Sequence, residues 1–338
     1  MKPRSPFIVS FTYDWIFFLA APMLALGLGI LVSDRPALSV SEYSFGGERD
    51  NLVGFFTGTI VHAHLVAVLF RSHGNASIRR LYPIRFLVVP VVLWLAIVVS
   101  PWIAVASTVV ATFWDVWHSG AQTFGFARIY ERNAGTPPEL GRRLDFVLQQ
   151  VLYAGPVLAG ATLVDHLDSF SNFDHIGSTL LSSVPTSIEA HHRELAYAVI
   201  GVATVVIAVY VLVYWQLAKR GAWSPPWLKI WLVASTGFVS IYTWGFNSWG
   251  QAFLIMNLFH AVQYLALVWA MEGTRIAGMM RLPKRAAFCV YFGGVVVYGL
   301  GVQALDPDIT TLWAITMVVS LMHFWYDAFV WSVRRAQV

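Results

Sequence analysis

Ten long apolar stretches constrain the fold of this chain more than any other feature of its sequence. They cover approximately residues 15–32, 52–70, 86–99, 101–126, 146–164, 195–217, 228–246, 251–271, 287–305 and 309–331. A helix that crosses the hydrocarbon core of a bilayer needs about 20 mostly apolar residues, and most of the stretches approach that length. We therefore predict an all-α, polytopic integral membrane protein, a helical bundle with about ten transmembrane helices in a single transmembrane domain, residues 1–338.

The composition supports this class. Hydrophobic residues make up 57% of the chain and charged residues only 12%, with a mean hydropathy of +0.63. Soluble globular domains carry about 25% charged residues, so a water-exposed surface of the usual kind is excluded. The single cysteine, Cys289, excludes an intramolecular disulfide, a cysteine-based zinc site and an iron–sulfur cluster.

Proline and charge patterns refine the topology. Pro101 predicts a break after Ser100, because proline disfavours helix for the residue before it and fits the first turn of the next helix. The longer outer loop, residues 165–194, is rich in Ser, Asp and His and is expected to carry a short surface helix. Nine or eleven helices remain alternatives to ten.

Basic residues indicate which loops face the cytoplasm. With the N-terminus inside, all but three of the 22 lysine and arginine residues fall in inside segments, the exceptions being Arg35, Arg49 and Arg193. Lys and Arg collect on the cytoplasmic side of membrane proteins, so we expect both termini in the cytoplasm and a location in a bacterial inner membrane. A basic balance spread over every inside loop is a topology signal, and it argues against nucleic acid as a partner.

Four histidines, His64, His118, His260 and His323, lie inside four different apolar stretches. Ionisable groups at membrane depth are costly and therefore indicate function. Counting back from the next charged residue, the four lie 7 to 12 residues inside their helices, which corresponds to roughly 10 to 18 Å along the axis. The expected topology makes these helices run in the same direction, so one polar centre in the cytoplasmic half of the bilayer could gather all four side chains.

Polar neighbours accompany each histidine at helical spacing. His62 and His64 point to nearly opposite faces, so only one of them is expected to bind, and His64 is favoured by its depth. Residues three or four apart share a face, which groups His118 with Asp115 and Gln122, His260 with Asn257, Gln263 and Tyr264, and His323 with Asp327. His323 and Asp327 form the strongest single pair of candidate metal ligands in the chain.

These residues predict a metal centre. The candidate ligands are His62, His64, His118, His260, His323 and Asp327, and the candidate catalytic groups are Asp115, Gln122, Asn257 and Gln263. Imidazole and carboxylate ligands without sulfur suit non-haem iron, and less specifically zinc, copper or manganese. We expect a metal-dependent oxidoreductase, an oxygenase or hydroxylase, that takes a lipid-soluble substrate from the membrane lipids and electrons from a donor protein. Trp114, Trp117, Phe324 and Trp325 are candidates to line an apolar substrate tunnel.

The His323-x-x-x-Asp327 spacing resembles that of histidine-rich polytopic non-haem iron enzymes of membranes. It is most similar to bacterial carotene dioxygenases of the bacteriorhodopsin-related-protein type, which place His about one turn before Asp in transmembrane helices. The resemblance implies iron-dependent oxidation of a lipid-soluble chain. It covers one segment only: the Pro-His-Gly signature of that family and the paired His-x-x-His-His boxes of membrane desaturases and hydroxylases do not occur here.

Two other functions fit the same residues. A b-type cytochrome would use two of the histidines to ligate haem b, but that leaves Asp115 and Asp327 without a role close to the iron. A proton-coupled or metal-ion-coupled transporter would use the His and Asp residues as a relay and predicts polar residues on a path to both sides.

Overall fold

The computed structural model describes residues 5–45, 48–305 and 310–331. Helices dominate, and the described strands are two short ones, β1 (Glu42–Phe45) and β2 (Glu48–Asn51), which pair antiparallel. The structure thus confirms the expected helical class. The terminal charges used in the topology argument, Lys2, Arg4, Arg334 and Arg335, lie outside the described residues. The chain forms two compact units, which are described separately.

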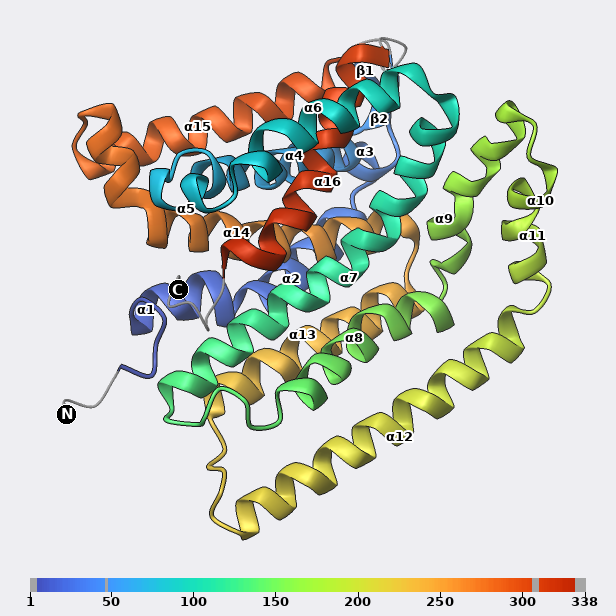
Figure 1. Cartoon of the computed structure of the whole chain (residues 1–338). Coiled ribbons are helices and arrows are strands. Elements are labelled where there is room, and N and C mark those ends of the chain that lie inside the picture. The colour runs from blue at the N-terminus through green and yellow to red at the C-terminus, as the bar shows by residue number, and fades with distance from the viewer. Residues whose placement is uncertain (1–4, 46–47, 306–309, 332–338) are drawn as a thin grey trace. The chain divides into compact units, whose positions relative to one another are not determined.

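Unit 1 comprises residues 1–27 and 112–256. Its complete elements are α1 (Phe11–Asp14), a π-helical turn η1 (Trp15–Leu19), α8 (Arg142–Ala159), α9 (Leu163–Leu167), a 3-10 segment η2 (Asp168–Ile176), α10 (Thr179–Ser182), α11 (Val184–Glu189), α12 (His192–Lys219) and α13 (Trp227–Phe246). Helix α8 packs against both α12 and α13 (Figure 1). The short elements from α9 to α11 cover most of residues 165–194, where the sequence predicts a short surface helix.

Unit 2 comprises residues 28–111 and 257–338. Besides the two strands, its complete helices are α3 (Pro36–Ser39), α4 (Leu52–Ser72), α5 (Ala76–Leu81), α6 (Pro83–Val99), α15 (Lys284–Gln303) and α16 (Thr310–Val330). Helix α4 packs against α15 and α16, and α16 also packs against α6 (Figure 1). Three further helices, α2 (Ala21–Ser33), α7 (Pro101–Asn133) and α14 (Trp249–Met280), begin in one unit and end in the other.

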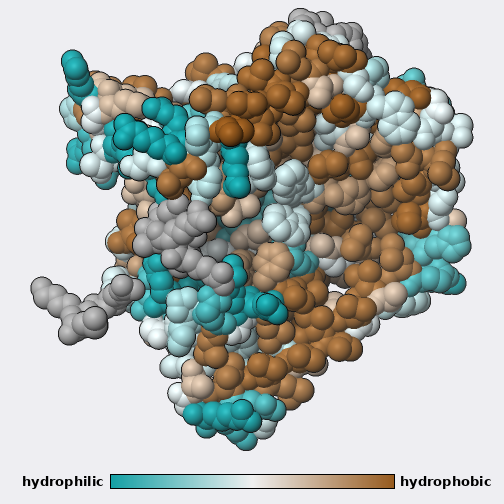
Figure 2. Space-filling view, in the orientation of Figure 1, coloured by the Kyte–Doolittle hydropathy of each residue, from teal (hydrophilic) through white to brown (hydrophobic). Residues whose placement is uncertain are grey.

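The chain carries the helices of an integral membrane protein. Five helices, α4, α12, α14, α15 and α16, are long and apolar enough to cross a membrane, and three bent helix pairs raise the number to as many as eight if each pair is one span. Helix α12 shows the pattern most plainly, since Figure 2 shows it as a hydrophobic band with hydrophilic surface at each end. Such a helix is suited to a lipid environment.

Two of the breaks between helices lie at a proline and at a glycine. As predicted, α6 ends at Val99 and α7 begins at Pro101, with a bend of 119° between them. The apolar stretch 146–164 was predicted as one helix, and here the sequence prediction is wrong, because α8 ends at Ala159. A Cβ atom at Gly160 would lie 2.2 Å from the Pro156 carbonyl oxygen and 2.5 Å from that of Trp244, so only glycine fits this turn.

Helix α15 approaches α4 very closely at Gly299. A Cβ atom there would lie 2.1 Å from the Thr59 carbonyl oxygen, a distance that excludes any side chain. Small residues at helix contacts allow backbones in a membrane to pack at short range. Thr59 precedes His64 by little more than one turn, so this contact fixes the part of α4 that carries the histidine.

Several charges that count toward the inside segments in the sequence are buried in helices. In unit 1, Lys229 Nζ lies 2.9 Å from Glu131 Oε2 and 2.8 Å from Asp145 Oδ1, and Arg128 pairs with the same two carboxylates. The Tyr214 hydroxyl donates to Asp145 Oδ1 at 2.7 Å. Two cations thus balance two anions, which offsets the cost of burying each charge. The network ties the C-terminal end of α7 to α8, α12 and α13.

Candidate metal centre

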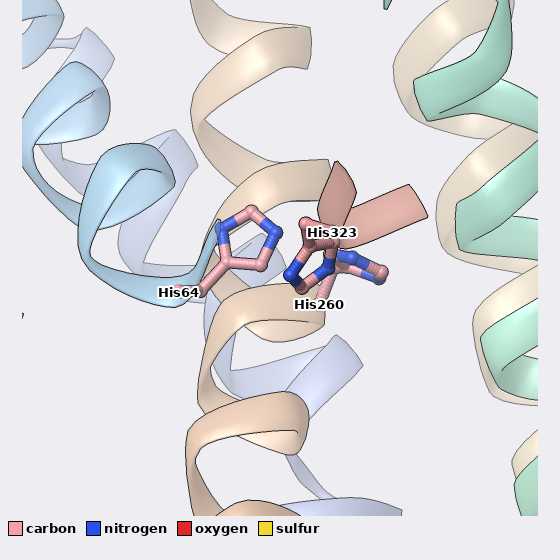
Figure 3. A group of neighbouring side chains, drawn as sticks. All are labelled: His64, His260 and His323. Carbon is pink, nitrogen blue, oxygen red and sulfur yellow. The ribbon is translucent and has the colours of Figure 1, made fainter. Parts of the chain in front are cut away.

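Three of the four predicted histidines meet in unit 2. His64 comes from α4, His260 from α14 and His323 from α16, and Figure 3 shows their rings gathered in one place. One ligand nitrogen from each ring lies within 4.8 Å of the others. The ring centroid of His64 is 5.0 Å from that of His260 and 5.0 Å from that of His323. We call these three residues the histidine triad.

All three rings of the triad are excluded from solvent. His64 and His323 are completely buried and His260 is 2% exposed. The rings of His260 and His323 stand nearly perpendicular to that of His64, at 88° and 82°. Buried polar groups normally require hydrogen-bond partners, so three imidazoles in mutual contact need a further explanation.

Neither ring nitrogen of His64 has a partner in good hydrogen-bond geometry within the described part of the chain, although backbone groups of Ile60 and Val61 lie near the ring. Leaving a buried donor or acceptor unsatisfied costs about 1–3 kcal/mol. A neutral imidazole always presents one lone pair, which is a metal ligand. A cation bound at His64 would therefore remove a penalty that the fold otherwise retains.

The hydrogen bonding of His323 assigns its tautomer. Its Nδ1 atom lies 3.0 Å from the carbonyl oxygen of Leu65, the residue after His64 on α4. A carbonyl oxygen can only accept, so we assign the proton to Nδ1 and the lone pair of the neutral ring to Nε2. Metal-binding histidines commonly donate their other ring nitrogen to a backbone carbonyl or a carboxylate in this way.

A carboxylate lies beside the triad. Asp327 Oδ2 is 3.7 Å from His323 Nε2, and its side chain is 10% exposed. The other carboxylate oxygen, Oδ1, accepts hydrogen bonds from the Tyr264 hydroxyl at 2.8 Å and from Trp331 Nε1 at 2.9 Å. Two donors thus hold Asp327 in one orientation, with Oδ2 toward the imidazole nitrogen that carries the lone pair.

A buried ion pair connects the three helices beyond the triad. Arg71 of α4 pairs with Glu272 of α14, and its Nε atom donates to the carbonyl oxygen of Val330 on α16 at 3.3 Å. In each helix this contact residue is C-terminal to the histidine, so α4, α14 and α16 run in the same general direction, as the sequence predicts. Arg71 was expected in a loop, but it is buried near the end of α4.

The other candidate residues divide between the two units. His62 is not part of the triad: its Nδ1 atom lies 2.8 Å from the Gly58 carbonyl oxygen on its own helix. Asn257 and Gln263 are buried on α14 in the same unit as the triad. His118, which is buried, and Asp115 and Gln122, which are half-buried, belong to the part of α7 in unit 1.

Two residues next to the triad were not among the predicted site residues. Tyr264 was recognised only for sharing a helix face with His260, and its ring centroid lies 4.6 Å from that of His323. Trp331, at the end of the apolar stretch 309–331, donates to Asp327 Oδ1. The spacing of four residues between Asp327 and Trp331 was the available signal, since such residues share a helix face.

The triad is nearly in ligand geometry. Metal–nitrogen bonds of about 2.0–2.1 Å in a tetrahedral site place the ligand nitrogens about 3.3 Å apart. The nitrogens here lie within 4.8 Å of one another, so side-chain rotations that move each nitrogen by about 1 Å would bring them to ligand distance. The residues therefore fit a single metal ion. Comparison of the chain with protein-family models, curated proteins and solved structures gave no match.

Proposed function

We propose that this chain is an integral membrane metalloprotein whose metal ion is held by His64, His260 and His323. The observation that carries the proposal is the buried His64 ring, which makes no hydrogen bond among the described residues although two other imidazoles surround it. A metal ion satisfies all three rings at once and cross-links α4, α14 and α16.

The ligand chemistry favours non-haem iron. The site offers imidazole nitrogens and a neighbouring carboxylate, Asp327, which is close enough to serve as a further ligand or as the partner of His323. Such mixed nitrogen and oxygen sites with open positions are typical of iron(II) enzymes that activate dioxygen. Haem is less suited, because a bis-histidine haem separates its two imidazoles by the macrocycle, whereas the triad rings contact each other.

The reaction we propose is oxidation of a lipid-soluble substrate by an oxygenase or hydroxylase. Helices α4, α14 and α16, which carry the triad, all have membrane-spanning length and hydropathy, which supports a substrate that comes from the bilayer. The electrons would come from a donor protein. We retain about ten spans, cytoplasmic termini and a bacterial inner membrane as parts of this proposal, with His118, Asp115, Gln122, Asn257 and Gln263 as candidates for supporting roles.

Metal analysis of the purified protein tests the proposal. We expect one iron per chain and no Soret band in the wild type, and loss of iron in His64→Ala, His260→Ala and His323→Ala. His62→Ala is the matched control, because it removes a histidine from the same helix that bonds to a backbone carbonyl instead. Wild-type protein that binds no metal under any loading condition would overturn the proposal, and a Soret band would select haem.

A further inference from the structure

A second candidate binding site lies away from the triad, on α5 and the first turn of α6. Three arginines, Arg79, Arg80 and Arg85, are exposed within seven residues of chain, and Leu81 and Ile84 between them are 57% and 67% exposed. Arginine beside exposed aliphatic side chains is the composition of a segment that lies at the boundary between headgroups and hydrocarbon.

None of these three arginines forms an ion pair with any residue that the structure describes. Glu272, the buried acid that contacts the α5 cap residue Asn75, already pairs with Arg71 and Arg275. Arg79 donates to the His73 carbonyl oxygen at 2.9 Å, which orients its side chain but does not neutralise its charge. The segment therefore presents positive charge that a ligand can neutralise.

Aromatic rings hold Arg85 in place. Its guanidinium carbon lies 5.1 Å from the ring centroid of Tyr82, 5.7 Å from that of Trp325 and 4.9 Å from that of Phe329. Cation–π contacts of this kind orient a guanidinium while leaving its N–H donors able to bind an anion. Arg85 is thus pre-organised, although it is exposed.

The position of the segment is also fixed. Asn75 caps α5 through the backbone N–H groups of Ser77 and Ile78, and its Nδ2 atom lies 3.2 Å from Glu272 Oε1 on α14. Helix α6 continues from the segment with strongly exposed apolar side chains. Figure 2 shows hydrophilic surface at the place of α5 next to hydrophobic surface at the place of α6.

We propose that Arg79, Arg80 and Arg85 bind the phosphate headgroup of an anionic phospholipid, while Leu81 and Ile84 contact its acyl chains. Exposed apolar side chains next to guanidinium groups that form no ion pair with the described residues favour a lipid over a soluble anion. Basic residues at a membrane surface contribute about a fivefold gain in affinity each for anionic lipid. This site is independent of the metal centre.

Native mass spectrometry of the full chain in detergent tests the proposal. We expect the wild type to retain phosphatidylglycerol in preference to phosphatidylcholine, and Arg79→Gln/Arg80→Gln to lose about fivefold in affinity for each arginine. The triple variant that adds Arg85→Gln should lose the preference. Arg193→Gln is the matched control, since Arg193 is exposed but lies next to Glu194, 3.7 Å away.

The Arg79→Gln/Arg80→Gln variant keeps the experiment informative if the triple variant fails to fold. It leaves in place Arg85 and its contacts with the aromatic rings. Equal retention of both lipids by the wild type, or unchanged preference in the double variant, would overturn the proposal. Inorganic phosphate added at the lipid concentration should not displace phosphatidylglycerol. Displacement would show that the site binds free phosphate, and it would overturn the choice of a lipid.

Discussion

Replacing His64 by leucine should change the stability of the protein in opposite directions with and without metal. Leucine is close to histidine in volume and has no polar atoms. Without metal, His64→Leu removes a buried imidazole whose nitrogens have no hydrogen bond among the described residues. Each unsatisfied polar group costs about 1–3 kcal/mol, so the metal-free variant should be more stable than the metal-free wild type by about that amount.

With metal present, the sign reverses. A ligand at 1,000 times its dissociation constant stabilises the native state by about 4 kcal/mol, and His64→Leu loses most of this linkage energy. The metal-loaded wild type should therefore be more stable than the variant under the same conditions. The difference between the two conditions, rather than either value alone, measures the metal contribution of His64.

The assay measures the free energy of unfolding in mixed micelles that are titrated with a denaturing detergent. It is run once with iron(II) under anaerobic conditions and once with a chelator. His62→Leu provides the comparison, because its ring bonds to the Gly58 carbonyl oxygen and lies outside the triad. Its effect should be the same in both conditions. A His64→Leu effect of the same sign and size with metal and with chelator would refute the reasoning.

Three further perturbations have expected outcomes. Gly299→Ala should destabilise the protein and lower metal occupancy, because its Cβ atom would lie 2.1 Å from the Thr59 carbonyl oxygen; detergent unfolding and metal analysis measure both, and unchanged values would contradict the close contact. Lys229→Met should cost about 3–5 kcal/mol in detergent unfolding, since it leaves buried carboxylate charge uncompensated, and a neutral effect would argue against the network. Asp327→Asn keeps an oxygen that accepts from Tyr264 but removes the charge beside His323, so chelator competition should show metal affinity lowered about 10–100-fold with little change in stability.

The sequence identified the histidine triad because depth in the membrane can be counted. The rise per residue of a helix is constant, so residues at similar distances from the charged helix ends lie at similar depth in the membrane. When the helices run in the same direction, these residues lie in one layer. This argument selected His64, His260 and His323. The same count selected His118, which is buried on the part of α7 that belongs to unit 1.

Tertiary contacts set the limits of prediction. In the sequence, Arg71, Arg128 and Lys229 count as inside charges, because a charge near the end of an apolar stretch is a topology signal in a single sequence. Only the folded chain shows that their carboxylate partners come from distant helices. Similarly, Pro101 predicted a break from local geometry, whereas the break at Gly160 depends partly on the distant Trp244 carbonyl oxygen.

Metal-edge X-ray absorption of the iron-loaded protein tests the central claim most directly. If one ion is shared by three imidazoles, the spectrum should show nitrogen or oxygen neighbours at about 2.0–2.2 Å with the multiple scattering of three imidazole rings, no sulfur, and loss of one ring in His64→Ala. A spectrum without imidazole scattering, or one that is identical in His64→Ala, would contradict the assignment of the metal centre to the triad.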